Sequence, residues 1–62
     1  MLDDVEFTVE LRKETEFAYL FFEGSKEVWI PKSVIRKMDQ IKKSKTYEIS
    51  VPYWFAKKRE LF

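Results

Sequence analysis

Nine cations gather in the second half of the chain, where their density suits the binding of phosphate groups. Residues 31–62 contain nine basic and three acidic residues, whereas residues 1–30 contain eight acidic and three basic ones. Clustered cations bind polyanions because each neutralised phosphate releases condensed counterions. The sequence therefore predicts a partner that is a nucleic acid, preferably single-stranded, held by these residues: Lys32, Arg36, Lys37, Lys42, Lys43, Lys45, Lys57, Lys58 and Arg59.

Aromatic residues lie among these cations, as they do in proteins that bind single strands. Such proteins pair a cationic groove with rings on which bases stack. Trp29 precedes Lys32, and Tyr53 precedes Lys57, so Trp29 and Tyr53 are the predicted stacking residues. A 62-residue chain also needs most of its eleven aromatic residues for its core. A core position is therefore the competing interpretation for each ring.

Two other hypotheses account for the charges. A lysine-rich segment is often only the solvated side of a helix. The acidic half, in turn, suits a basic protein partner, so that the chain would act as an inhibitor or adaptor. The three hypotheses stay open at this point: phosphate binding, protein binding and a charged solvated surface.

The chain lacks the residues that most enzymes and metal sites use. It contains no cysteine and no histidine, so the usual zinc ligands and the usual general base are missing. Its carboxylate pairs, such as Asp3 with Asp4, are not set in a glycine-bearing calcium loop. We expect no catalytic residues, no metal and no cofactor. No apolar run approaches about 20 residues, and we expect a cytoplasmic protein with no membrane partner.

The first half of the chain has the pattern of antiparallel strands. Apolar and polar residues alternate over 5–11, which predicts a half-buried strand. A polar connection leads to a second strand at 16–23, and the only glycine, Gly24, marks the turn to a third at 27–30. Both faces of the second strand are apolar. Its second face, which would bind a protein partner or a second copy in a homodimer, consists of Ala18, Leu20 and Phe22.

The second half of the chain predicts helices on either side of one strand. Apolar residues at i, i+4 and i+7 predict a short basic helix over 32–43, with Ser33 as its N-cap. Alternation predicts a fourth strand over 46–51, and Pro52 begins a terminal helix over 53–61. The predicted fold is one α+β domain over 1–62. It consists of a four-stranded antiparallel sheet or partly open barrel, a helix before the last strand and a C-terminal helix.

Two segments, Glu27–Ser33 and Val51–Phe62, resemble a group of short proteins of phages, plasmids and other mobile elements. That group shows a "WIPKS" segment and a terminal "PxWLAxxKGL" helix. The resemblance implies a compact β-rich domain in a viral or mobile-element protein, with Trp29 and Trp54 packed inside. Phe55 replaces the usual leucine. Arg59-Glu60 replaces the usual Lys-Gly, which implies that the helix continues instead of ending there.

Overall fold

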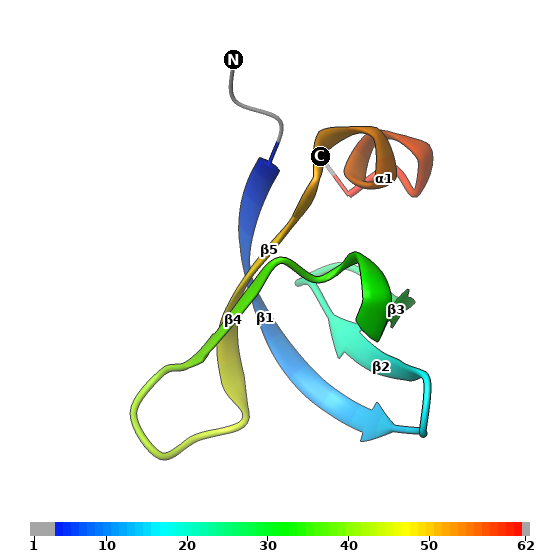
Figure 1. Ribbon diagram of the computed structural model, residues 1–62. Coiled ribbons are helices and arrows are strands. Elements are labelled where there is room, and N and C mark those ends of the chain that lie inside the picture. The colour runs from blue at the N-terminus through cyan, green and yellow to red at the C-terminus, as the bar shows by residue number, and fades with distance from the viewer. Residues whose placement is uncertain (1–3, 62) are drawn as a thin grey trace.

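The computed structural model describes residues 4–61 and contains five strands and one α-helix (Figure 1). The predicted α+β class and the antiparallel sheet are confirmed, but the prediction of four strands and two α-helices is wrong. In chain order the elements are β1 (Asp4–Glu14), β2 (Ala18–Phe22), β3 (Glu27–Pro31), the 3₁₀-helix η1 (Lys32–Val34), β4 (Lys37–Gln40), β5 (Thr46–Pro52) and α1 (Tyr53–Lys58).

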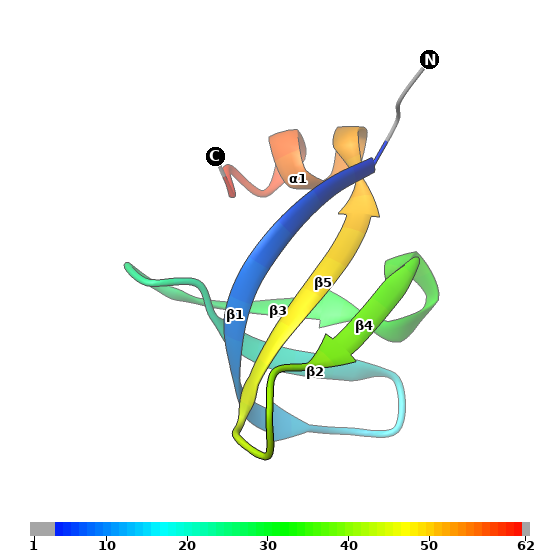
Figure 2. The same cartoon turned by 90° about the vertical axis from the view of Figure 1, so that its left-hand side faces the viewer.

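The strand β1 lies in the middle of the sheet, whose order is β3-β2-β1-β5-β4. Its first part, Asp4 to Glu10, pairs with β5, and its last part, Glu10 to Glu14, pairs with β2. All pairs are antiparallel. The register with β2 shifts between Leu11 and Lys13, so Arg12 forms a β-bulge. Bulges bend a strand and increase its twist, and β1 curves strongly in Figure 2.

The connection between the two edge strands shows that the sheet curls. In a flat sheet of five strands, β3 and β4 would lie about 19 Å apart, at about 4.8 Å per strand. Only residues 32–36 join them, and three of these residues form η1, which rises only about 2 Å per residue. Because so short a link cannot span a flat sheet, its two edges must approach each other.

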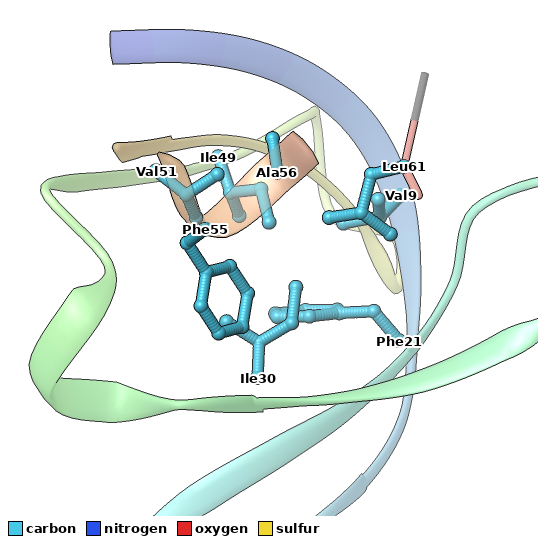
Figure 3. Close-up of a cluster of buried hydrophobic side chains, with 8 residues drawn as sticks. All are labelled: Val9, Phe21, Ile30, Ile49, Val51, Phe55, Ala56 and Leu61. Atoms are coloured by element: carbon cyan, nitrogen blue, oxygen red, sulfur yellow. The ribbon is translucent and has the colours of Figure 1, made fainter. Parts of the chain in front are cut away.

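The concave side of the sheet and α1 enclose the core (Figure 3). The predicted alternation over 5–11 is confirmed, since Val9 is buried and Val5, Phe7 and Leu11 pack beside the core. Helix α1 contributes side chains that pack onto those of the strands. The buried cluster consists of Val9, Phe21, Ile30, Ile49, Val51, Phe55, Ala56 and Leu61.

The predicted helix over 32–43 is wrong. This segment contains η1 and then β4, and the N-cap position of η1 is Pro31, so Ser33 is not an N-cap. Met38 lies opposite Ile49 and packs against the core, whereas Ile41 is exposed. Pairing with β5 gives β4 hydrogen bonds between strands, which apolar periodicity along the chain cannot reveal. Of the residues whose spacing predicted a helix, Met38 is the one that points inward from β4.

The boundaries of the first hairpin also differ from the prediction. β1 continues to Glu14, and β2 begins only at Ala18, so Phe17 lies in the turn with 75% of its surface exposed. The Thr15 hydroxyl accepts a hydrogen bond from the Ala18 N–H at 3.1 Å. This threonine turn fixes the connection that the sequence analysis placed at 12–15.

The terminal helix is shorter than predicted and does not continue through Arg59-Glu60. It ends at Lys58, and Glu60 adopts a positive φ of 57°. The Leu61 N–H donates to the Ala56 carbonyl at 2.9 Å, and the Glu60 N–H donates to the Lys57 carbonyl at 3.1 Å. These two bonds form a Schellman motif, in which glycine usually occupies the position of Glu60. The motif turns Leu61 back into the core.

The strained backbone at Glu60 predicts a stabilising substitution. Glu60→Gly should raise the free energy of unfolding by about 0.5–1 kcal/mol, because glycine adopts a positive φ without steric cost. Chemical denaturation measures the change. Lys57→Gly, inside α1, is the matched control and should lower the free energy of unfolding by about 1 kcal/mol. A destabilised Glu60→Gly variant would contradict the role given to this turn.

Candidate nucleic-acid interface

The nine predicted phosphate-binding cations do not form one patch. In both views the loop between β4 and β5 lies at one end of the molecule and α1 at the other (Figures 1 and 2). Lys42, Lys43 and Lys45 are exposed on that loop, which we call the basic loop. Lys57 and Lys58 lie on α1, and Arg59 directly follows it. The structure therefore separates two groups that the sequence analysis had joined.

The other three predicted cations lie next to acidic side chains. Lys32 Nζ lies 2.6 Å from Glu14 Oε2, and this hydrogen bond raises the pKa of Lys32. Arg36 lies 3.9 Å from Asp4, and Lys37 lies 3.5 Å from Asp39. All three pairs are at the surface, where such contacts are weak. Within residues 4–61, the lysines of the basic loop form no ion pair of this kind.

Ser44 holds the basic loop in one shape. Its hydroxyl donates to the Ile41 carbonyl at 2.7 Å and accepts from the Thr46 N–H at 3.1 Å. Gln40 Nε2 donates to the Ser44 carbonyl at 2.6 Å. The three lysines therefore extend from an ordered turn that closes the β4–β5 hairpin.

Two further cations, Arg12 and Lys13, lie at the same end of the molecule and were not among the predicted site residues. The Leu11 N–H donates to the Lys45 carbonyl at 2.8 Å, which places the end of β1 beside the basic loop. Sequence reasoning had assigned Arg12 and Lys13 to a polar connection in the acidic half. Their place depends on the pairing of β1 with the β4–β5 hairpin, and no local signal in the sequence shows that pairing.

The outer face of strands β1, β2 and β3 combines cations with aromatic rings. We call this surface the meander face: Arg12, Lys13, Leu20, Phe22 and Trp29. Leu20 lies between Lys13 on β1 and Trp29 on β3. Directly opposite residues of antiparallel strands point to the same side. These three side chains therefore form one row across the sheet, on the side opposite Phe21.

The bulge places Arg12 above the next row of the meander face. Its guanidinium carbon lies 4.6 Å from the centre of the Phe22 ring, within the range of a cation–π contact. Arg12 also lies 3.1 Å from Glu10, which holds the guanidinium above the ring. Arginine in contact with an aromatic ring is also used in nucleic-acid recognition.

Trp29 and Trp54 do not pack inside, contrary to what the resemblance implied. Trp29 is 42% exposed and Trp54 is 58% exposed. Alternation along β3 points Ile30 into the core and Trp29 to the outer face. In α1, Phe55 and Ala56 are buried in the core, whereas Trp54 is not. Trp29 is therefore accessible to a partner, and stacking on its ring stays a prediction.

The other predicted stacking residue, Tyr53, lies on α1 and is 46% exposed. Lys57 Nζ lies 6.0 Å from the centre of its ring. Lys26 Nζ donates to the Arg59 carbonyl at 3.4 Å and joins the β2–β3 turn to the end of α1. This second group of rings and cations faces away from the basic loop.

The predicted self-association surface is only partly available. Leu20 is 8% exposed, and Arg12 covers the Phe22 ring. Ala18, at the end of the same face, lies opposite Pro31 and is half-buried. The apolar second face of β2 is therefore filled mainly by its own neighbours within the chain.

The outer face of β1, β5 and β4 is acidic. Its register places Glu6 opposite Ser50 and Thr8 opposite Glu48, with Asp39 beyond Glu48 on β4. A shallow depression at the end of this face is lined by Asp4, Val5, Glu6, Arg36, Lys37 and Ser50. We call these strands' outer surface the acidic face, because carboxylates dominate it.

Within residues 4–61, no set of three or more acidic side chains is arranged to hold a metal ion. None of the helices in that range is long and apolar enough to span a membrane. Comparisons of this chain with models of protein families, with curated proteins and with solved structures gave no match.

The turn that supports β3 predicts a pH dependence. Glu23 Oε1 accepts hydrogen bonds from the Ser25 hydroxyl, from the Ser25 N–H at 2.7 Å and from the Lys26 N–H at 3.1 Å. These bonds, chiefly those from Ser25, lower the pKa of Glu23. A lowered folded-state pKa gives stability that is present above the unfolded pKa of about 4.3. That stability is lost as the pH falls through the folded pKa.

Glu23→Gln should therefore lower Tm at pH 7 and have less effect near pH 2, because the stability that the carboxylate contributes decreases as the pH falls. Thermal unfolding followed by circular dichroism at both pH values measures this. Glu16→Gln, in the exposed β1–β2 turn, is the matched control. An equal loss of Tm at both pH values would refute the role of the Glu23 carboxylate.

Proposed function

We propose that this protein binds single-stranded nucleic acid on the meander face and the adjoining basic loop, without catalysing a reaction. The observation that carries the proposal is the row in which exposed Trp29 and Lys13 flank Leu20. A base can stack on Trp29 while its phosphates lie toward Lys13. The resemblance to mobile-element proteins supports a role as an accessory protein of a virus or mobile element.

The arrangement favours a single strand over a duplex. A ring stacks on a base only where that base is free of its neighbours, and each such stack contributes about 1–3 kcal/mol. The cations bind the backbone without reading its sequence. We therefore expect strong salt dependence and little sequence preference.

Reversing two charges of the basic loop tests the electrostatic part. Lys42→Glu with Lys43→Glu should weaken binding of a labelled single-stranded oligonucleotide. Loss of two phosphate contacts should reduce the slope of log K against log salt by about 1.4. Fluorescence anisotropy at several salt concentrations gives both quantities.

The matched control is Lys57→Glu with Lys58→Glu, which changes the net charge equally at the other end of the molecule. We expect a smaller loss of affinity in this variant. An equal loss in both double variants would show that net charge, and not the basic loop, determines binding.

Removing the exposed ring tests the stacking part. Trp29→Ala should weaken oligonucleotide binding by about 5- to 150-fold, the equivalent of about 1–3 kcal/mol. Trp54→Ala removes the other exposed tryptophan and serves as the control, with affinity close to that of the wild type. Unchanged affinity in Trp29→Ala would refute stacking on the meander face.

A second candidate function is protein binding through the acidic face. The row of Thr8, Glu48 and Asp39 places two carboxylates side by side on neighbouring strands, which suits a basic partner. The oligonucleotide titration separates the two functions. Absence of binding at low salt would reject nucleic-acid binding and leave the acidic face as the surface to pursue.

A further inference from the structure

Strand β3 is an edge of the sheet, and its outward backbone groups follow from the register. Within residues 4–61, β3 pairs only with β2. The Glu23 N–H donates to the Lys26 carbonyl at 3.2 Å, and the Lys32 N–H donates to the Phe17 carbonyl at 2.8 Å. Residues 26 and 32 therefore both bond toward β2, at the two ends of one regular ladder.

In an antiparallel ladder, hydrogen-bonded and non-hydrogen-bonded pairs alternate strictly. The even-numbered residues Val28 and Ile30 thus bond to β2, and the odd-numbered residues direct their backbone groups away from it. These outward groups are the N–H and C=O of Glu27, the N–H and C=O of Trp29, and the C=O of Pro31. Proline has no N–H, so its place at the end of β3 matters for any further pairing.

The outward groups of β3 are complementary to those of a second β3 that runs in the opposite direction. With the two copies of Trp29 opposite each other, each N–H reaches the carbonyl of the other. In the same register the Glu27 N–H of each copy meets the Pro31 carbonyl of the other copy. Pro31 accepts this bond through its carbonyl but has no N–H to donate in return, so the Glu27 carbonyl of each copy stays without a bond across the pair.

The other edge, β4, does not fit β3. The Ile41 N–H donates to the Thr46 carbonyl at 2.8 Å. The odd-numbered residues of β4 therefore form hydrogen bonds with β5, and the backbone N–H and C=O of Met38 point away from β5. Met38 packs against the core, whereas Trp29 lies on the outer face. Pairing Trp29 with Met38 would join the outer face of one sheet to the inner face of the next. The β3 edge therefore matches itself better than it matches β4.

The lysines at the ends of β3 do not block this edge. Edge strands often avoid pairing by exposing lysine side chains. Here Lys26 Nζ lies 3.4 Å from the Arg59 carbonyl, and Lys32 Nζ lies 2.6 Å from Glu14. Both side chains are thus drawn toward groups of their own chain.

We propose that two copies of this chain pair through their β3 edges, antiparallel and around a two-fold axis that passes between the two Trp29 residues. Such an isologous contact closes at a dimer. It differs from the predicted homodimer through Ala18, Leu20 and Phe22, because backbone groups of β3 form it. The two meander faces would become one continuous surface. The pairing does not rest on the proposed function, since it needs no nucleic acid.

Sedimentation equilibrium of the protein alone tests the pairing. The wild-type mass should rise with concentration toward twice the 7.6 kDa of one chain. Glu27→Pro removes an outward N–H at the first residue of the strand, where proline is tolerated, and should return the mass to that of one chain. Glu27→Ala keeps the N–H and should still form the dimer.

The exchange rate of the Trp29 amide provides a test without substitution. Hydrogen exchange followed by NMR should show that this amide becomes protected as the concentration rises, together with the change in mass. A single-chain mass and rapid exchange of Trp29 at millimolar concentration would overturn the pairing. A dimer that persists in folded Glu27→Pro would overturn it as well, because its interface would lie elsewhere.

Discussion

The β-bulge at Arg12 is the feature on which the rest of the arrangement depends. The strand β1 must pair with β5 along its first part and with β2 along its last part. One extra residue bends the strand between these partners. The bend helps the sheet to curl so that residues 32–36 can join its two edges. It also places Arg12 over Phe22 and sets Lys13 in the row of Leu20 and Trp29.

The division of charge along the sequence is not preserved in space. Strand pairing brings acidic residues of the first half to basic residues of the second, as in the contacts of Glu14 with Lys32 and of Asp4 with Arg36. It also brings two cations of the first half, Arg12 and Lys13, to the end of the molecule that carries the basic loop. The surface therefore has an acidic face, one end that carries the basic loop with Arg12 and Lys13, and an opposite end that carries the cations of α1.

Local patterns predicted the parts of the fold that local physics determines. Alternation identified the inward side of β1, and Pro52 and Gly24 marked the start of α1 and the β2–β3 turn. The segment 32–43 was misassigned because Met38, its inward residue within β4, is fixed by pairing with β5, while Val34 packs against the core from η1. The helix end was misassigned because Glu60 takes a positive φ that glycine would normally supply.

The candidate site was predictable in composition but not in position. Residue type and spacing suggested Trp29 and the lysines of the basic loop, and the structure leaves these residues exposed. The separation of that loop from α1, and the position of Lys13 in one row with Leu20 and Trp29, depend on contacts between distant residues. Exposure of Trp29 likewise depends on which side of β3 faces the core. Because its neighbours Val28 and Ile30 are also apolar, the sequence does not show which side that is.

The most direct test of the central claim uses Trp29 as its own reporter. The chain contains two tryptophans, so Trp54→Phe leaves Trp29 as the only one. Titration with a single-stranded oligonucleotide should quench the emission of Trp29, and added salt should restore it. Emission that stays unchanged while anisotropy reports binding, or the absence of any binding at low salt, would contradict stacking on the meander face.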